Sequence, residues 1–265
     1  MSASNPFVAS QLVDSWSGLS SFILPLRLNE IISVLTHCGD DRHVCVSHNC
    51  THGTVQNMRT ATDKKPPTTR ERLLDIAEEA VLQKGFAATS IDELISGAGI
   101  TKSGFFYHFK DKTELARALL QRYLERDAAI LDDLFNRAME LHEDPLHSLL
   151  IGLKMFSELM SDLPAQHPGC LASSFCYQDH LFDHEIRSLN AQGFIAWRKR
   201  FRGYLDRIAE RYPPKADINL DSLADMATAL VDGGIILSRA LKDRQILPEQ
   251  IMLYRGYIKL LFEPG

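Results

Sequence analysis

The sequence predicts an all-α protein in which three short, closely spaced helices precede a larger helical domain. Apolar residues recur every three or four positions from about residue 70 onward, and no long segment alternates apolar and polar residues as a strand does. Gly and Pro residues separate the periodic segments. With 265 residues, of which 45% are hydrophobic and 24% charged, the chain has the composition of an ordinary globular protein.

The first 69 residues form two segments without predicted helices. Residues 1–57 show no periodicity, and we expect either an unstructured extension or sequence upstream of a natural start at Met58. Cysteines and histidines gather there, but their spacing lacks the two close pairs of a structural zinc site, so no metal site is expected. Residues 58–69 are rich in Lys, Pro and Thr, which predicts a flexible basic arm.

Three short helices follow the arm, and each begins with a side chain that can cap it. Thr68 with Glu71, and Ser90 with Glu93, have the spacing of capping boxes. The predicted helices are 70–84, 91–98 and 102–107, with Thr101 as the cap of the third and Gly85 and Gly99 as stops of the first two.

The second and third helices are joined by a tight turn, which is the pattern of a helix-turn-helix. The third helix presents Thr101, Lys102 and Ser103 at its N-terminal end. Helix N-termini carry free N–H groups and partial positive charge that suit phosphate oxygens, and short polar side chains there can reach base edges in the major groove. The pattern therefore indicates a DNA-binding unit.

Residues Arg70 to Tyr123 resemble the DNA-binding domain of the TetR family of transcriptional regulators. The segment GFAATSIDELISGAGITKSGFFYHFKDKTEL contains the aromatic-rich run that ends the family's recognition helix, followed by Lys110, Asp111 and Lys112. Two positions depart from the family pattern. Phe106 stands where a tyrosine hydroxyl commonly touches DNA, and Ile95 stands where the family usually has a small alanine.

The resemblance implies a function, a domain division and a set of contacts. It implies a cytoplasmic, sequence-specific transcriptional regulator, typically a repressor, which binds a palindromic double-stranded DNA operator as a homodimer and is released by a small-molecule effector. The implied domains are residues 70–124 for DNA binding and 125–265 for effector binding and dimerisation. The DNA-facing residues are expected to be Thr101, Lys102, Ser103, Tyr107, His108 and Lys112, although the lysines could instead be solvated surface charges. Phe105 and Phe109 are expected in the core.

The distribution of charge agrees with this division. The formal net charge is −5, and the segments 1–57, 58–126 and 127–265 carry −2, +2 and −5. The only positive segment therefore contains the helix-turn-helix, as attraction to phosphates requires.

The rest of the chain is predicted to be helical. The expected helices are 111–142, 145–163, 170–182, 184–212, 221–242 and 248–262, which makes nine with the first three.

The last two helices are the expected dimer interface. Gly233 and Gly234 each cost about 1 kcal/mol in a helix relative to alanine, and close helix approach is the expected compensation. One apolar face of each helix could form a four-helix bundle from two chains. The residues assigned to that interface are Leu223, Ala227, Leu230, Gly234, Leu237, Leu241, Ile251, Tyr254 and Ile258. The alternative is that both helices complete the core of a single chain.

The effector pocket is expected between residues 145 and 197, where flexible and aromatic side chains gather. The candidates are Met155, Phe156, Met160, Cys170, Phe175, Cys176, Tyr177, His180 and Trp197. They suit a small, largely apolar or aromatic molecule, although any helical core contains the same residue types. Oxidation of Cys170 and Cys176 is the less favoured alternative, because six positions along one helix place side chains on nearly opposite faces.

The sequence favours a regulator over an enzyme. It has no glycine-rich phosphate loop, nucleophile elbow or His-Glu-x-x-His helix, so no catalytic residue, metal or cofactor is expected. A DNA-binding architectural protein is a third hypothesis, which would leave the large acidic helical domain unexplained. Arg27 and Glu30 interrupt the most apolar early segment, so we expect no membrane span and no secretory signal.

Overall fold

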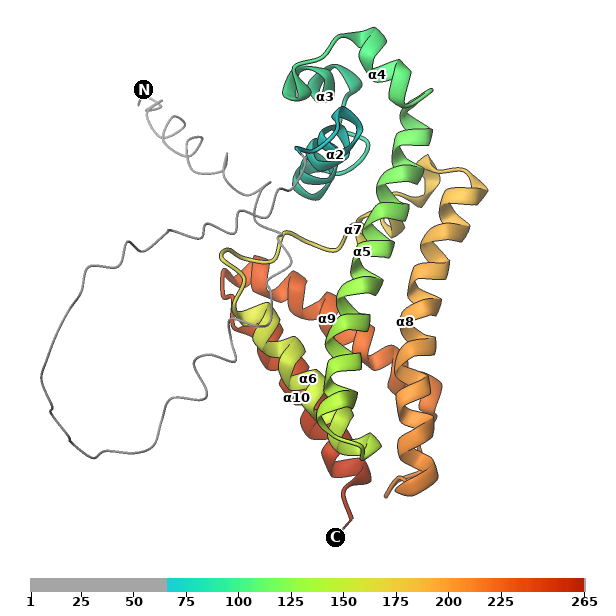
Figure 1. The fold of residues 1–265 in the computed structure, drawn as a ribbon, viewed down its shortest axis with the longest axis vertical. Helices are drawn as coiled ribbons and strands as arrows, with labels where there is room; N and C mark the ends of the chain where they lie inside the picture. The colour runs from blue at the N-terminus through green and yellow to red at the C-terminus, as the bar shows by residue number, and fades with distance from the viewer. Residues whose placement is uncertain (1–65, 265) are drawn as a thin grey trace, which may run out of the picture. The chain divides into compact units, whose positions relative to one another are not determined.

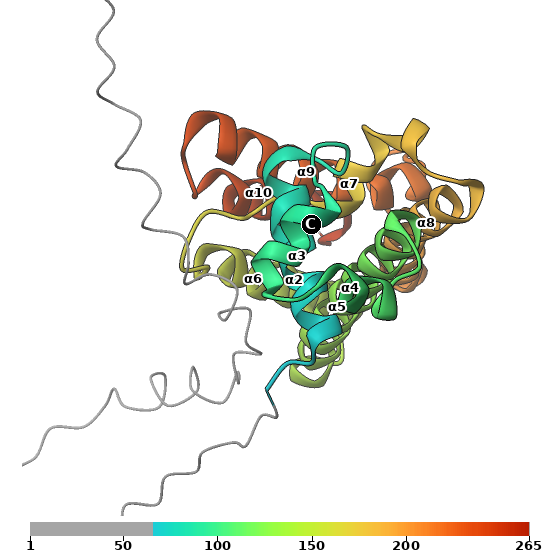
Figure 2. The same cartoon turned by 90° about the horizontal axis from the view of Figure 1, so that it is seen from above.

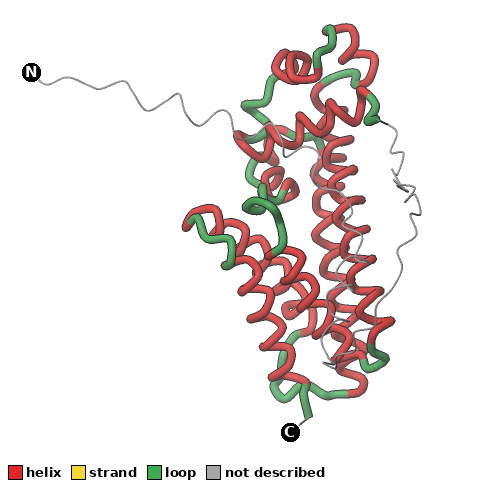
Figure 3. Tube along the Cα trace, turned by 60° about the vertical axis from the view of Figure 1, so that its left-hand side comes forward, coloured by secondary structure: helices red, strands yellow, loops and turns green. Residues whose placement is uncertain are grey.

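The computed structural model describes residues 66–264, and every regular element within that range is helical (Figure 3). The range contains nine α-helices and one short 3-10 helix, so the all-α prediction is confirmed there. The predicted extension, the cysteines and histidines within it, and most of the basic arm lie outside the described residues. Within the described range, no helix is both long enough and apolar enough to cross a membrane.

The first three described helices form what we call the head. They are α2 (Thr69–Lys84), α3 (Ile91–Ala98) and α4 (Lys102–His108). Both predicted capping boxes are present, at Thr68 and at Ser90. Gly99 ends α3 in the left-handed helical conformation, with φ 64° and ψ 37°, whereas Gly85 ends α2 with a positive φ of 84° but a ψ of 161°. Both glycines therefore adopt a φ that a side chain would disfavour.

The remaining helices form what we call the body. They are α5 (Lys112–Leu141), α6 (Pro145–Ser161), α7 (Leu171–Cys176), η2 (Asp179–Leu181), α8 (His184–Arg211), α9 (Leu220–Leu241) and α10 (Ile246–Phe262). Most ends lie within two residues of the predicted ones. The predicted helix 170–182 is instead divided into α7 and η2, because backbone bonds between residues three apart replace the α-helical pattern after Cys176.

The long helix α5 connects the head to the far end of the body (Figure 1). It packs against α6 and α8, while α10 packs against α6 and α9, and α9 also packs against α8 (Figures 1 and 2). The core of the body is formed by buried residues of α5, α6, α8, α9 and α10. The core of the head also includes residues from the body. Four come from the first turns of α5 and four from the segment after α6, namely Leu115, Ala116, Leu119, Leu120, Leu171, Phe175, Phe182 and Ile186.

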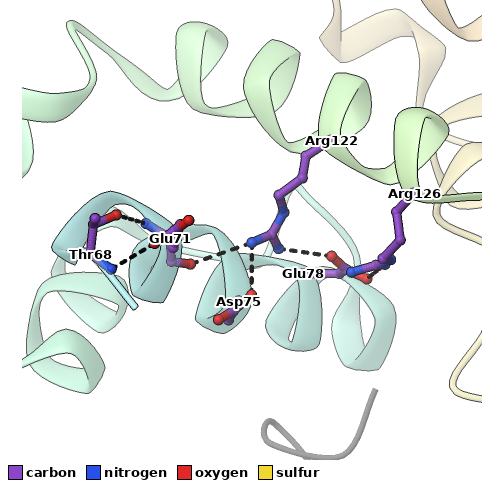
Figure 4. A network of polar contacts seen from close by, with 6 residues as sticks. All are labelled: Thr68, Glu71, Asp75, Glu78, Arg122 and Arg126. Atoms are coloured by element: carbon purple, nitrogen blue, oxygen red, sulfur yellow. Dashed lines mark hydrogen bonds and ion pairs between the residues drawn. The ribbon is translucent and has the colours of Figure 1, made fainter. Parts of the chain in front are cut away.

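Two arginines of α5 fix α2 in place (Figure 4). Arg122 donates to Asp75 Oδ1 at 2.7 Å and to Glu78 Oε2 at 2.9 Å, and Arg126 pairs with the other oxygen of Glu78. Glu78 is only 8% exposed, so its charge is removed from most of the solvent. The two guanidinium groups compensate that loss of hydration and hold the head on α5.

Candidate functional site

The N-terminal end and one side of α4 face solvent. Lys102, Ser103 and Tyr107 are exposed, and Tyr107 is 85% exposed. Phe105 and Phe109 are fully buried, as predicted, and they fix the orientation of the helix.

One of the predicted DNA-facing groups, the Thr101 hydroxyl, already has hydrogen-bond partners within the chain. The Thr101 hydroxyl accepts the Gly104 N–H at 3.2 Å and shares a hydrogen bond of 2.9 Å with Ser103 Oγ. His108 is half-buried and its ring meets Tyr107 edge to face, at 5.0 Å between centroids. Lys102 and Tyr107 therefore carry the freest polar groups on this side of α4.

Lys112 lies partly inside the molecule. Its ammonium donates to Phe86 O at 2.7 Å and lies 4.4 Å from the centroid of the Phe86 ring. Burial lowers the pKa of Lys112. The side chain therefore has a structural partner, and its predicted contact with phosphate stays a prediction.

Side chains of the α7–η2 region of the body contact the turn between α2 and α3. Phe86 packs against Phe175 at 5.8 Å and Phe182 at 5.0 Å between ring centroids. Gln178 Oε1 accepts the Ala87 N–H at 3.1 Å. A Cβ at Gly85 would lie 2.2 Å from Gln178 Nε2, so a larger residue there would displace the end of the Gln178 side chain. The α7–η2 segment therefore sets the position of that turn.

The structure does not bring the nine predicted pocket residues together. Met155, Phe156, Met160, Cys170 and Trp197 pack in or against the core of the body, whereas Phe175 lies in the core of the head. Cys176, Tyr177 and His180 are exposed, and Tyr177 is 77% exposed. The physical reason is the end of α7 at Cys176, beyond which the chain turns outward. The pocket as predicted therefore needs revision.

A polar cluster that the sequence interpretation missed joins four helices inside the body. Asp127 of α5 accepts the Trp197 Nε1–H at 2.6 Å, and Asp232 of α9 accepts the Ser173 hydroxyl at 2.7 Å. Burial, and then the charge of Asp232, raises the pKa of Cys170 to about 11, and the Tyr123 hydroxyl bonds to this thiol. The signal that could have revealed the cluster is a carboxylate within an apolar stripe, as in Asp127 between Leu120 and Leu131.

The same thiol is a poor candidate for oxidation. Cys170 is the N-cap of α7 and stays protonated at neutral pH because of its raised pKa. Cys176 lies at the other end of α7 and accepts from Asn190 Nδ2 at 3.2 Å. Both cysteines are free, and the structure offers no support for a disulfide between them.

Most of the predicted interface residues belong to the core of one chain, which corrects the prediction. Leu223, Ala227, Ile251, Tyr254 and Ile258 are each at most 3% exposed, and Leu230 packs against the same core. The close approach expected at Gly234 occurs within the chain, because a Cβ there would lie 3.2 Å from the Leu247 Cα of α10. Only Leu237 and Leu241 of the predicted set are exposed. The error arose because α9 and α10 are apolar on two faces.

The outward faces of α9 and α10 carry large apolar side chains. Ile236, Leu237 and Leu241 on α9 are 46% to 66% exposed, and Leu253 and Leu260 on α10 are 63% and 73% exposed. Met252 and Tyr257 add smaller exposed fractions. Single exposed apolar residues are common, but a group of this size on two adjacent helices is typical of a protein interface.

Comparison with known proteins agrees with this architecture. A sequence model of the family described as "Bacterial regulatory proteins, tetR family" matches residues 73–119. The chain is 32% identical over 180 residues to the HTH-type transcriptional regulator TtgR of Pseudomonas putida, covering 66% of this chain and 82% of that protein. It is 22% identical over 184 residues to the HTH-type transcriptional repressor DhaR of Mycobacterium sp., covering 68% and 87%. A TetR-family regulator from Cytophaga hutchinsonii shares the fold, with a TM-score of 0.61 at 18% identity, over 74% of this chain and 96% of that one.

Proposed function

The chain belongs to the TetR family of DNA-binding transcriptional regulators, and from this premise we propose that it is a repressor that binds a palindromic operator as a homodimer and leaves it when a small molecule binds the body. The observation that carries the proposal is the α7–η2 segment. Ser173 of this segment donates a hydrogen bond to Asp232 of α9. Gln178, further along it, accepts the Ala87 N–H in the turn between α2 and α3.

The proposed DNA contacts are divided between base edges and phosphates. Lys102 and Ser103 lie at the N-terminal end of α4, where base edges of the major groove can be reached. Thr101 contributes as the N-cap of α4, because its hydroxyl accepts the Gly104 N–H and so fixes this end of the helix. Tyr107, His108 and Lys112 are proposed to contact phosphates, which position a protein on DNA without reading its sequence.

The proposed dimer uses the outward faces of α9 and α10 rather than their inward faces. Leu237, Leu241, Leu253 and Leu260 supply the apolar centre that a stable interface requires. Two-fold symmetry places two copies of α4 on one face of the dimer, so that they can occupy half-sites about one helical turn of DNA apart.

Release by an effector follows from the position of α7. Ser173 ties α7 to Asp232 of α9, and Gln178 ties the next segment to the turn after α2. A ligand that displaces α7 would therefore move the head relative to the body. In a dimer this movement changes the separation of the two heads, and with it the fit to the operator.

The test uses the full chain and the intergenic DNA beside its gene. Leu253→Glu places a charge in the centre of the proposed interface, and Ile130→Glu, on the exposed face of α5, is the matched control. We expect sedimentation to show a dimer for the unchanged chain and the control but a monomer for Leu253→Glu. The monomer should lose at least about a hundredfold in affinity for a palindrome, since it can occupy only one half-site at a time. Tight operator binding by a monomer would contradict the proposal.

A further inference from the structure

Phe106 is a large apolar side chain that α4 exposes to solvent. It is 45% exposed, and the adjacent Tyr107 is 85% exposed. Among the described residues of the head, no other large apolar side chain is as exposed as either of them. Single exposed apolar residues are common, so exposure alone would mean little. Here the two exposed rings are consecutive residues of the helix that is proposed to contact DNA.

The position of Phe106 on α4 places it beside polar residues of the DNA-facing set. Phe106 follows Lys102 by four positions and Ser103 by three, and residues at these separations are neighbours on a helix surface. Lys102 and Ser103 are both exposed, whereas Phe105 and Phe109 mark the buried side of the helix. A surface that brings Lys102 and Ser103 to DNA therefore includes the Phe106 ring.

The ring of Phe106 is supported by the core of the head. It meets the ring of Phe105 edge to face, at 5.4 Å between centroids and an interplanar angle of 90°. Phe105 is fully buried and also packs against Phe109, at 5.8 Å between centroids. A ring that rests on a buried ring has few alternative positions, so it loses little conformational entropy when it contacts DNA.

The chemistry of a phenyl ring limits what Phe106 can contact in the major groove. It has no hydroxyl, so it cannot donate a hydrogen bond to a phosphate or to a base. The base edges in that groove consist of hydrogen-bond donors and acceptors, with one apolar exception, which is the C5-methyl group of thymine. Contact with any other base edge would remove polar groups from water without giving them a partner. The thymine methyl is therefore the group that suits this ring.

We propose that Phe106 is a specificity-determining residue whose ring contacts the C5-methyl group of one thymine in each half-site of the operator. This inference rests on the proposed function, in which α4 enters the major groove, and it adds a sequence preference to that function. Lys102 and Ser103 are proposed to reach polar base edges, whereas Phe106 selects by apolar contact. Phenylalanine in place of the family's common tyrosine thus exchanges a polar contact for one that depends on sequence.

The experiment first obtains the operator with the protein itself. The full chain selects its preferred sequence from a pool of synthetic duplexes with a random central segment. The pool contains no methylated cytosine, so thymine is its only source of a C5-methyl group. Each thymine of the selected duplex is then replaced in turn by uracil, which removes the methyl group and keeps every hydrogen-bonding group of the base pair. Fluorescence anisotropy measures the affinity for each duplex.

The expected result is a methyl effect at one position of each half-site. We expect uracil at that position to weaken binding about fourfold, because one methyl group then stays without its apolar contact. Uracil at both symmetrical positions should weaken binding about fifteenfold, since the two half-sites lie far enough apart for their effects to combine independently.

Two substitutions assign the methyl effect to a residue. Phe106→Ala should bind the thymine and uracil duplexes equally, because its side chain no longer reaches the methyl group. Tyr107→Ala is the matched control, since it truncates the neighbouring exposed ring, and it should keep the fourfold ratio while binding both duplexes more weakly. The ratio compares two duplexes on the same protein, so it does not depend on how much of a variant is folded.

Two results would overturn the inference and leave the proposed function intact. One is a selected operator in which no thymine is found whose replacement by uracil weakens binding. The other is a fourfold ratio that persists in Phe106→Ala, because another residue would then contact the methyl group. A selection that enriched no sequence at all would contradict the proposed function and the inference together.

Discussion

Two carboxylates beside the middle of α5, those of Glu78 and Asp127, have different kinds of hydrogen-bond partner. At the contact between α2 and α5, Glu78 is bonded to both Arg122 and Arg126. Asp127, the next residue along α5 after Arg126, accepts only a neutral indole N–H. The comparison teaches that buried charge has two uses in this chain. Ion pairs at Glu78 fix α2 on α5, whereas the carboxylate of Asp127 fixes the indole of Trp197 and so connects α5 with α8.

The largest expected effect comes from removing the charge of Glu78, the carboxylate with two arginine partners. Glu78→Gln removes the charge shared by Arg122 and Arg126, and we expect a loss of about 3 kcal/mol in the free energy of unfolding at neutral pH. Urea unfolding measures it, with Glu79→Gln as the control, because Glu79 is exposed on the same helix. The control should change the unfolding free energy by less than about 0.5 kcal/mol. An equal loss in both variants would show that the two arginines do not depend on Glu78.

A smaller effect on stability, which depends on pH, is expected at Asp144, the N-cap of α6. Burial alone would raise the pKa of Asp144, but hydrogen bonds from Tyr212 and from the backbone and ring of His147 hold it below its usual range. Its folded pKa therefore lies below the unfolded value of about 3.9, so its stabilisation is full above that pH and is lost as the pH falls through the folded pKa.

Asp144→Asn should accordingly cost about 1 to 2 kcal/mol of unfolding free energy at pH 7. The difference from the unchanged chain should shrink below about pH 4. Chemical denaturation at a series of pH values measures both quantities. A difference that stayed constant down to acid pH would mean that the charge of Asp144 is not what stabilises the α5–α6 connection.

The smallest effect distinguishes two lysines of the DNA-binding region. Lys102→Ala removes an exposed charge that is proposed to reach base edges, so it should leave stability unchanged and lower the preference for the operator over random DNA. Lys112→Ala removes a proposed phosphate contact, so it should flatten the salt dependence of DNA affinity by about one unit. Lys112→Ala also removes the bond to Phe86 O, so it should cost about 1 kcal/mol of unfolding free energy in addition. Fluorescence anisotropy over a range of salt concentrations, together with thermal unfolding, measures these effects. Unchanged stability in Lys112→Ala would show that its contact with Phe86 is incidental.

The head was predictable from sequence because its signals are local. The capping boxes at Thr68 and Ser90, the stop at Gly99 and the buried Phe105 and Phe109 each depend on residues a few positions apart. Local rules of this kind do not require knowledge of which helices meet.

The sequence predicted where the helices of the body begin and end. It did not predict which apolar face of α9 or α10 packs into the core of the same chain. Leu223 and Leu253 both lie on apolar faces of α9 and α10, yet one is 2% and the other 63% exposed. Periodicity cannot decide which of two apolar faces meets the same chain. The bonds of Asp127 to Trp197 and of Ser173 to Asp232 were missed for a related reason, since each joins two helices that meet only through tertiary packing.

The core of the head has a consequence for protein engineering. A fragment that ended at residue 124 would lack Leu171, Phe175, Phe182 and Ile186, all of which are at most 5% exposed within that core. The head is thus not a portable module. A chimaera that joined it to another sensing domain would have to carry the α7–η2 segment along, or supply four apolar side chains that fill the same space.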